Sequence, residues 1–263
     1  MLPRVTVIDG IDAKYIVMPN DDISRIVFTH GNYDPITTYI ASLFCDLHEN
    51  PCVIDIGANI GTFTVPIAQK LLGKGHVLSF EPQQTTFYQL CGNLVLNRLD
   101  NVTAHETALS DTDNLVEFSH IDYENNRNNG GLSIDGTYNK LQNIIVDQSR
   151  NSTIRPITLD SVAIDKSVAV IKIDVEGFER KVILGGREFL RFHNYPPLLF
   201  EAWRYEWFTD ERKALLDLVD QDLGYELFEY DQNLGNFVAQ HPENPYYFKF
   251  KVDGGQISWT RVR

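Results

Sequence analysis

The residues best placed to do chemistry form a short glycine-rich segment, Asp-Ile-Gly-Ala-Asn-Ile-Gly at 55–61. An apolar run at 52–56 leads into it and apolar residues at helical spacing follow it, which is typical of a buried strand, a tight turn and a helix. Glycine suits such a turn because it adopts positive φ and lets a ligand approach the backbone closely. The spacing differs from G-x-G-x-x-G, and Asp55 precedes the first glycine. A carboxylate at this strand tip would repel a pyrophosphate and attract an ammonium group.

A second carboxylate, Glu81, ends the next apolar run, at 76–80. In a strand–helix–strand nucleotide fold, an acid at this strand tip accepts hydrogen bonds from ribose hydroxyls. A nucleoside that carries an amino acid in place of a second phosphate would satisfy both Asp55 and Glu81. The sequence therefore predicts a site for S-adenosylmethionine, and a plain structural turn is the alternative.

Three further carboxylates, Asp174, Glu176 and Glu201, follow later apolar runs and are candidates for the reacting centre. Asp174 is the first choice, because a lone carboxylate that ends an apolar strand is costly without a partner. Glu201 ends the run at 198–200, where desolvation would raise its pKa toward that of a useful base. The alternatives are that Glu176 stabilises a helix N-terminus and that Glu201 pairs with Arg204.

The same acids are the candidates for a metal site. Asp174 and Glu201 on adjacent strand tips would suit Mg²⁺, which prefers carboxylate ligands, but the sequence offers no evident third ligand. The metal requirement therefore stays unknown, with Asp174 and Glu201 as its ligands if one exists.

Aromatic and histidine side chains give weaker indications. Trp203, Tyr205 and Trp207 would form a stacking wall for a sugar ring, although aromatics at this spacing are more often packing residues. His30 and His193 are further candidate bases, with surface or capping roles as the default.

Composition narrows the choice of partners. The 263 residues include 23 basic and 36 acidic ones, a net charge of −13, and the basic residues are scattered, so nucleic acid is a disfavoured partner. No apolar run approaches the length needed to span a bilayer, and Met1 to Arg4 lack the character of a signal segment. Three cysteines without metal-ligand spacing suggest buried free thiols. We expect a cytoplasmic protein without a membrane span, and the sequence leaves a homodimer open.

The positions of these residues imply alternating strands and helices, hence a mostly parallel sheet with right-handed crossovers. Strands are predicted at 52–56, 76–80, 102–107, 168–174 and 197–202, and helices at 61–72, 84–97, 178–191 and 207–222. Ahead of them we predict a hairpin within 4–18 and helices at 21–28 and 36–47, and after them an antiparallel strand pair at 224–228 and 246–252.

One stretch, 111–167, interrupts this alternation. It is polar and asparagine-rich, and it would emerge at the carboxyl edge of the sheet, outside which ligands bind in folds of this kind. A lid over an acceptor site is the favoured interpretation, and a flexible decoration is the alternative.

Five ordered motifs give the chain a family resemblance. Besides the glycine-rich segment they are Phe-Glu-Pro at 80–82, Ala-Leu-Ser-Asp at 108–111, Thr-Leu-Asp at 158–160 and Val-Ile-Lys-Ile-Asp-Val-Glu-Gly-Phe-Glu at 170–179. Together they resemble the FkbM-type methyltransferase family over roughly residues 50 to 205.

The resemblance implies an α/β fold of the class I, Rossmann-like kind, a seven-stranded, mostly parallel sheet with helices on both faces. It implies a single methyltransferase domain over 1–263, with 1–50 as an N-terminal extension or lid, 51–110 and 168–263 as the core, and 111–167 as the insertion near the acceptor. The donor would be S-adenosylmethionine. The residues carried over to its site are Asp55, Gly57, Asn59 and Gly61 at the methionine end, Glu81 at the ribose, and Thr107, Ala108 and Leu109 beside the adenine.

The implied reaction is O-methylation of a hydroxyl on a sugar, a glycan or a small natural product, with Asp174 and Glu176 near the transferred methyl group. Two alternatives remain open. One is an RNA 2′-O-methyltransferase, in which Lys172 would assist at the ribose. The other is a catalytically silent member of the family that serves as a binding or scaffold subunit.

Overall fold

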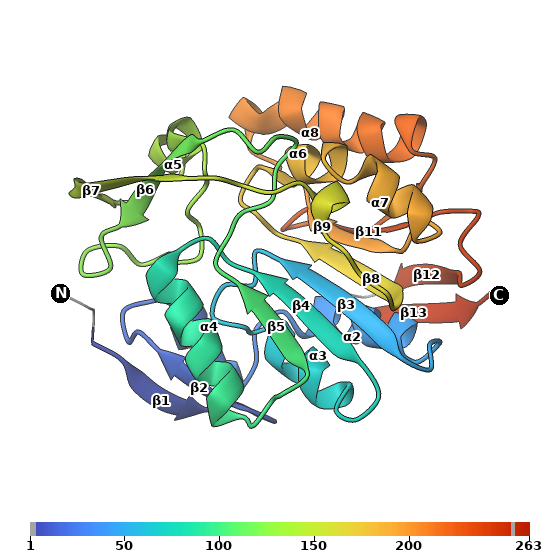
Figure 1. Ribbon diagram of the computed structural model, residues 1–263, viewed down its shortest axis with the longest axis horizontal. Coiled ribbons are helices and arrows are strands. Elements are labelled where there is room, and N and C mark those ends of the chain that lie inside the picture. The colour runs from blue at the N-terminus through green and yellow to red at the C-terminus, as the bar shows by residue number, and fades with distance from the viewer. Residues whose placement is uncertain (1–3, 254–255) are drawn as a thin grey trace.

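The apolar runs predicted as strands form the centre of a seven-stranded sheet with the order β10-β11-β9-β8-β3-β4-β5 (Figure 1). The computed structural model describes residues 4–253 and 256–263, so part of the N-terminal segment considered above lies outside the described residues. The five consecutive strands from β9 to β5 in this order are parallel, and β11 is antiparallel to both of its neighbours. This confirms the α/β fold with a mostly parallel sheet. The strands are β3 (Pro51–Ile56), β4 (His76–Phe80), β5 (Val102–His105), β8 (Ser167–Ile173), β9 (Leu198–Glu201), β10 (Glu226–Asp231) and β11 (Asn236–Gln240).

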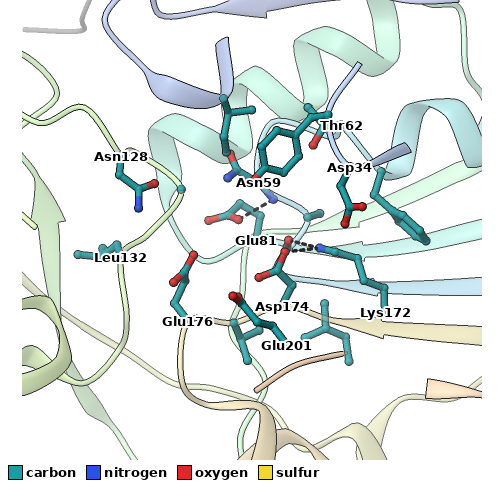
Figure 2. Close-up of a pocket in the computed structure, with 18 of the residues that line it drawn as sticks. Asp34, Asn59, Thr62, Glu81, Asn128, Leu132, Lys172, Asp174, Glu176 and Glu201 are labelled. Atoms are coloured by element: carbon teal, nitrogen blue, oxygen red, sulfur yellow. Dashed lines mark hydrogen bonds and ion pairs between the residues drawn. The ribbon is translucent and has the colours of Figure 1, made fainter. Parts of the chain in front are cut away.

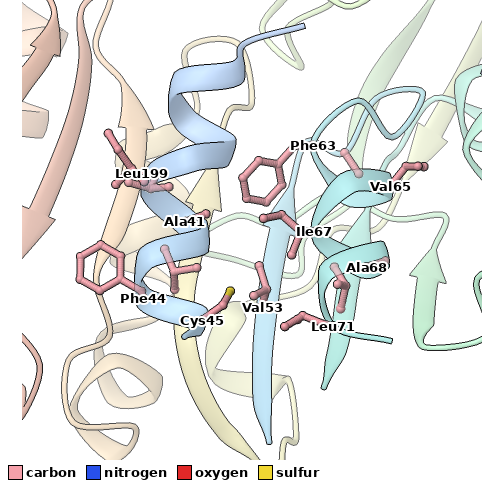
Figure 3. Packing of buried hydrophobic residues seen from close by; sticks show 14 of the residues in the cluster. Ala41, Phe44, Cys45, Val53, Phe63, Val65, Ile67, Ala68, Leu71 and Leu199 are labelled. Atoms are coloured by element: carbon pink, nitrogen blue, oxygen red, sulfur yellow. The ribbon is translucent and has the colours of Figure 1, made fainter. Parts of the chain in front are cut away.

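Alternate residues of each central strand enter two separate hydrophobic cores, one on each face of the sheet. Val53 and Val170 belong to the first core, while their neighbours Ile54 and Ile171 belong to the second. In Figure 3, Ala41 and Phe44 of one helix and Ile67 of another pack around Val53 in the first core. Burial on both faces explains why these strands read as continuous apolar runs.

Helices cover both faces, as expected. The first core includes side chains from α2 (Pro35–Cys45), α3 (Thr64–Lys70) and α4 (Gln84–Leu96), and the second from α6 (Glu179–Leu184), α7 (Arg187–Phe192) and α8 (Thr209–Asp217). In Figure 1, α6, α7 and α8 lie above the sheet, and α3 and α4 lie below it. Across residues 4–253 and 256–263, none of the helices combines the length and the apolar character that a membrane crossing requires.

The helix predicted at 178–191 is in fact two helices, α6 and α7, separated by Gly185 and Gly186. A Cβ at Gly185 would overlap the carbonyl oxygen of Ser110, and a Cβ at Gly186 would lie 2.7 Å from the Leu159 side chain. The glycines therefore let the helical region approach the loops after β5 and before β8. The helix predicted at 207–222 begins with a short 3₁₀ turn (Glu206–Phe208), continues as α8 and ends in a π-helical turn (Leu218–Asp222).

The predicted pairing at the C-terminus is wrong. The strand that begins at Glu226, β10, pairs with β11, a strand that the sequence did not indicate. The strand expected at 246–252 is β12 (Phe248–Asp253), and it pairs with β13 (Gln256–Arg261) in a separate hairpin. A hairpin therefore does exist at the edge of the main sheet, but it pairs the first predicted strand with the segment that lies between the two predicted strands.

The N-terminal extension and the insertion are joined to each other. The extension contains β1 (Thr6–Asp9), β2 (Lys14–Val17), α1 (Asp22–His30) and α2, and the insertion contains β6 (Val116–Ile121), α5 (Gly136–Leu141), β7 (Val146–Ile154) and a 3₁₀ turn (Leu159–Ser161). The buried Asp21 carboxylate accepts hydrogen bonds from Ser24 N at 3.0 Å, which caps α1, and from Asn129 N at 3.1 Å. The Asp22 N–H donates to Arg127 O at 2.8 Å. The insertion is thus docked on the start of α1.

Candidate functional site

A cavity of about 540 Å³ lies at the carboxyl ends of β3, β4, β8 and β9 (Figure 2). Ligands bind outside this edge of the sheet in open α/β folds. The loops after the central strands supply most of the lining, α1 and α2 add Ile23, Ile26 and Ile36, and the insertion adds Asn128, Gly130, Leu132 and Ile134. The predicted core, the extension and the insertion therefore meet at one space.

The turn after β3 is held open by its glycine. Gly57 has φ +82°, and a Cβ there would overlap the carbonyl oxygen of Asp174 at the tip of β8. The N–H groups of Gly57 and Ala58 donate to Phe80 O at 3.0 and 2.9 Å, which ties the turn to β4. Asn59 follows with φ +50°, a left-handed conformation that asparagine tolerates. Gly57 and Asn59 both line the cavity.

Glu81 lies in the cavity wall at the tip of β4, as predicted from its position in the sequence. Its Oε2 accepts the Asn59 N–H at 2.9 Å, and its Oε1 accepts the Gln83 N–H at 2.8 Å. Burial raises its pKa to about 7, against the lowering effect of those two backbone hydrogen bonds. Each oxygen accepts one bond from the backbone and has a second lone pair available. The carboxylate is therefore fixed in place with the capacity to accept from a diol.

Asp55 does not line the cavity. It is fully buried beneath the turn. There it accepts a hydrogen bond from Thr64 Oγ1 at 2.5 Å and forms an ion pair with Lys172 Nζ at 3.1 Å. Asp55 and Lys172 are direct neighbours in the register of β3 and β8. The ammonium group that meets Asp55 is thus the chain's own. Gly61 has φ +90° and likewise does not line the cavity. A Cβ added there would lie 2.8 Å from the Leu90 side chain.

Lys172 connects Asp55 to the cavity. Its Nζ also donates to Gly57 O at 2.9 Å and lies 3.3 Å from Asp174 Oδ2. Asp55 and Asp174 together raise the pKa of Lys172, against desolvation, which lowers it. The ammonium therefore stays charged, fixes the carboxylate of Asp174 and holds the glycine turn from below.

The loop after β5 gives the cavity an apolar wall. Thr107, Ala108 and Leu109 all line it, and Ala108 and Leu109 are buried. The backbone of this loop is anchored by hydrogen bonds to Ile157, from Ile157 N to Ala108 O and from Ser110 N to Ile157 O, both at 3.0 Å. A rigid apolar wall beside Glu81 suits a flat heterocyclic ring.

The three candidate catalytic acids converge on the same space. Figure 2 shows Asp174, Glu176 and Glu201 side by side below Glu81, and all of them line the cavity. Burial and the neighbouring acids raise the pKa of Glu176 and of Glu201 well above the ordinary glutamate value. Glu176 has φ +56°, an uncommon backbone conformation for glutamate and one that clusters at functional sites.

Glu201 does not form the ion pair with Arg204 that was considered as its alternative role. Arg204 pairs with Glu229, at 2.5 Å, so the alternative of a Glu201–Arg204 pair is wrong. Within residues 4–253 and 256–263, neither Glu176 nor Glu201 forms an ion pair with a basic side chain. Glu179 differs, because its carboxylate accepts from Val175 N at 3.0 Å and shapes the loop after β8.

Asp34 is a cavity residue that the sequence did not reveal. It caps α2 by accepting the Thr37 N–H at 3.1 Å, and it has φ +45°. Burial raises its pKa. An Asp-Pro pair ahead of an apolar helix predicts a cap, but the approach of that cap to the tips of β8 and β9 depends on tertiary packing.

Two of the three predicted aromatic residues line the cavity. Trp203 is buried and Tyr205 is half-exposed, and both are part of its wall. Trp207 lies behind Tyr205, with the two rings stacked at 4.9 Å and 10°. Tyr138 of the insertion packs edge-on against Trp203 at 5.9 Å. His30 and His193 are not among the cavity residues.

The predicted acids do not make a metal centre in the structure. Within the described ranges no group of three or more His, Cys, Asp or Glu side chains is arranged to hold a metal ion. The nearest charge to Asp174 is the ammonium of Lys172. The Asp174–Glu201 pair thus gains no third ligand, and no step of the chemistry below is assigned to a metal.

The residues present do fit S-adenosylmethionine. Glu81 has free lone pairs that could accept from the ribose, the wall at 107–109 would border the adenine, and the Asn59 turn would lie at the methionine end. Asp174 and its neighbouring acids would face the sulfonium ion. The groups that line the cavity are therefore compatible with this donor, with Lys172, rather than Asp55, reaching its edge.

Comparison with known proteins identifies the family of the chain. The profile of the Methyltransferase FkbM domain matches residues 55–227. The chain is 28% identical over 151 residues to Methyltransferase 1 of Beauveria bassiana, covering 52% of this chain and 59% of the fungal protein. It is 31% identical over 107 residues to a tRNA(Phe) (4-demethylwyosine(37)-C(7)) aminocarboxypropyltransferase of Methanocaldococcus jannaschii, covering 38% of this chain and 40% of that protein.

A third relative, the hexuronic acid methyltransferase AglP of Haloferax volcanii, is 25% identical over 196 residues, which cover 73% of this chain and 72% of AglP. The matches thus span only about half of the length of the first two relatives. The family profile, however, covers well over half of the 263 residues and contains all of the predicted donor-site residues and candidate catalytic acids. The chain therefore belongs to the FkbM methyltransferase domain family, whose methyl donor is S-adenosylmethionine.

Proposed function

We propose that this protein is an S-adenosylmethionine-dependent O-methyltransferase that acts on a hydroxyl of a sugar, a glycan or a small natural product. The observation that carries the proposal is the shared cavity, in which Glu81 and the Gly57 turn face Asp174, Glu176 and Glu201. The first group supports donor binding, and the second supports activation of an acceptor beside it.

The chain's own residues would act by positioning and by proton transfer. The donor supplies an electrophilic methyl group when bound. Glu81 and the 107–109 wall orient the nucleoside, which aligns the methyl group with an acceptor hydroxyl and supplies much of the rate. Lys172 holds Asp174 at 3.3 Å, so that the Asp174 charge faces the donor cation.

A hydroxyl is a poor nucleophile at neutral pH, so its proton must be removed as the new bond forms. Glu201, with Glu176 beside it, is the base that we assign to this step. Burial and neighbouring acids raise the pKa of Glu201, which makes the carboxylate a stronger base than an exposed glutamate. Its place at the tip of β9 puts it on a rigid element.

The aromatic wall favours a sugar-like acceptor. Trp203 and Tyr205 border the acceptor side of the cavity, where a ring could stack on them. The relative named a hexuronic acid methyltransferase is consistent with a carbohydrate acceptor in this family. We also propose that the extension and the insertion cover this side, since both contribute lining residues.

The test is in two parts. Calorimetry should detect binding of S-adenosylmethionine and S-adenosylhomocysteine to the purified protein, and radiolabelled methyl transfer should be found with a panel of hydroxylated sugars. We expect Glu201→Gln to lower kcat by about 10²–10⁴-fold, the usual contribution of a general base, while donor affinity changes little. Asp174→Ala should abolish turnover in a folded protein. Failure to bind either nucleoside would remove the proposal.

The two alternatives have less support. For RNA 2′-O-methylation Lys172 would have to meet a ribose, but its ammonium is bound by Asp55, Asp174 and Gly57 O. A silent scaffold would need neither the paired Glu176 and Glu201 nor the left-handed backbone at Glu176. Unaltered methyl transfer in Asp174→Ala would remove that residue from the mechanism, whereas donor binding without methyl transfer to any acceptor tested would favour the scaffold interpretation.

A further inference from the structure

The cavity is strongly acidic on its acceptor side. Of the described residues that line it, Lys172 is the only lysine, arginine or histidine. The acids that line it are Asp34, Glu81, Asp174, Glu176, Glu201 and Asp231. The ammonium of Lys172 is already shared between the buried Asp55 and Asp174. The remaining acids therefore have no basic partner among the described side chains that line the cavity.

The donor can balance only part of this charge. S-adenosylmethionine carries a sulfonium, an ammonium and a carboxylate, a net charge of +1 near neutral pH. After it binds, Glu176, Glu201 and Asp34 still face the acceptor space without an ion pair to a described basic side chain. Acids crowded together in this way retain protons when no counter-charge is present, and a cation bound beside them would favour their ionised forms.

Resting on the proposed methyl transfer to a hydroxyl, we propose that the acceptor is a hydroxylated compound that carries a protonated amino group, such as an amino sugar. Asp34, Glu176 and Glu201 select for that charge. An ammonium group has three N–H donors and no acceptor, and it forms short, charge-assisted bonds with carboxylates. Trp203 and Tyr205 would contact the ring that bears it.

The same charges exclude anionic acceptors. A uronate would bring another carboxylate into a space bordered by Glu176 and Glu201, where like charges repel strongly in a partly desolvated setting. The preferred acceptor of this chain therefore differs from a hexuronic acid, the acceptor that the name of the Haloferax relative indicates.

The direct test measures binding to the full chain saturated with S-adenosylhomocysteine, and also to the chain alone. The probes are one methyl hexoside, its 2-amino form, its N-acetylated 2-amino form and its uronic acid. Calorimetry should show the amine binding about 10-fold tighter than the neutral sugars and about 100-fold tighter than the uronate, each tenfold being about 1.4 kcal/mol. Equal binding of amine and N-acetyl forms, a preference for the uronate, or no binding by any of them would overturn the proposal.

Asp34→Asn removes one charge with little risk to the fold, because asparagine keeps the cap on Thr37 and tolerates a φ of +45°. It should reduce the preference for the amine over the N-acetyl form about 3–10-fold and leave binding of the neutral hexoside unchanged. Glu188→Gln, an exposed partner of Arg191, is the matched control and should change neither. An unchanged preference in Asp34→Asn, Glu176→Gln and Glu201→Gln would remove the assignment of these residues.

The outcomes separate this inference from the proposed function. Selective binding of the amine without methyl transfer to any probe would support the charge assignment and contradict the proposed reaction. Methyl transfer with the uronate as the better acceptor would support the proposed reaction and contradict the charge assignment.

Discussion

Lys172 is the residue on which the electrostatics of the site depend. Asp55 is fully buried, and a carboxylate in that position is stable only if it is paired and hydrogen-bonded. Lys172 supplies the charge, Thr64 the hydrogen bond, and the lysine reaches Asp174 as well. One ammonium group therefore supports both the interior below the donor turn and the acid that faces the donor.

Lys172→Met tests this role. Removing the cation leaves Asp55 uncompensated in the interior, so we expect the free energy of unfolding to fall by about 3–5 kcal/mol. Denaturant unfolding, followed by fluorescence at pH 7.5, measures the loss. Adding Asp55→Asn to Lys172→Met should recover at least half of it. If the double variant is as unstable as the sum of the two single variants, the pairing does not carry the stability.

The paired glutamates predict a pH-dependent stability. Burial and neighbouring acids raise the pKa of Glu176 and Glu201 in the folded protein above the ordinary value of 4.5. The fold therefore binds these protons more tightly than the unfolded chain does. The stabilising contribution is fully present below pH 4.5 and is lost as the pH rises through the folded pKa values.

The variant Glu176→Gln/Glu201→Gln should consequently melt at a higher temperature than the native chain at pH 8, and the gap should narrow at pH 5. In a protein of this size each kcal/mol corresponds to about 2–4 °C in Tm. Scanning calorimetry of the donor-free protein at both pH values gives the comparison. Glu188→Gln should show no such pH-dependent gap, and a gap of equal size at both pH values would contradict the assignment.

At this scale, much of the site could be predicted from sequence. Glu81, Asp174, Glu176 and Glu201 end apolar runs, and strand ends of a parallel sheet share one edge. The partner of Asp55 differs from the one expected. The sequence predicts that an ammonium group of the donor meets Asp55, because the register of β3 against β8 cannot be read from local periodicity. In the observed register Asp55 lies opposite Lys172, so the lysine supplies the ammonium group.

At the scale of elements, the contact between the tips of β3 and β8 sets the geometry. Gly57 lies against the Asp174 carbonyl, so the turn after β3 and the end of β8 approach each other closely. Only glycine allows this together with φ +82°. The relative position of donor and acid is therefore a property of two backbones.

Gly57→Ala should lower the free energy of unfolding by about 3 kcal/mol and abolish donor binding. A left-handed alanine costs about 1–2 kcal/mol, and displacing a packed backbone adds to that. Gly73→Ala is the control, because Gly73 has φ +72° but no atom within 4 Å of the added Cβ. Denaturant unfolding and calorimetry with S-adenosylhomocysteine measure both effects. Equal losses in the two variants would show that backbone strain alone is responsible.

The predictable elements are those with a strong apolar period or a continuous apolar run, which is why the central strands match closely. Strand β11, Asn236–Gln240, is short and adjoins a polar turn, so its pairing with β10 was missed. The break between α6 and α7 depends on Ser110 and Leu159, residues that are distant in sequence. Interruptions imposed by tertiary contacts cannot be read from local periodicity.

At the scale of the molecule, the extension and the insertion meet beside the turn at Asn59, where we propose that they cover a bound donor. Asp21 bonds both Ser24 and Asn129, and a Cβ at Gly130 would overlap the side-chain amide of Asn59. A bound donor beneath Asn59 would be enclosed by this contact. Opening the cover requires the two segments to separate or to move together.

Asp21→Ala should loosen the cover. We expect S-adenosylhomocysteine to dissociate about 5–10-fold faster, because a buried bond between the segments and a helix cap are lost together. Stopped-flow displacement gives the rate. Asp147→Ala, which removes an acid that only bonds the exposed Ser149, should leave it unchanged. An unaltered rate in Asp21→Ala would mean that the cover does not limit release.

The seating of Gly130 on Asn59 also bears on how such enzymes diversify. We expect a change of acceptor to need new side chains in the insertion. Most of that segment lies away from the turn at Asn59. At its docking point, a side chain at position 130 would displace the amide group of Asn59. We expect this segment to be exchangeable between related enzymes, provided that a glycine at position 130 and the asparagine at position 59 are both present.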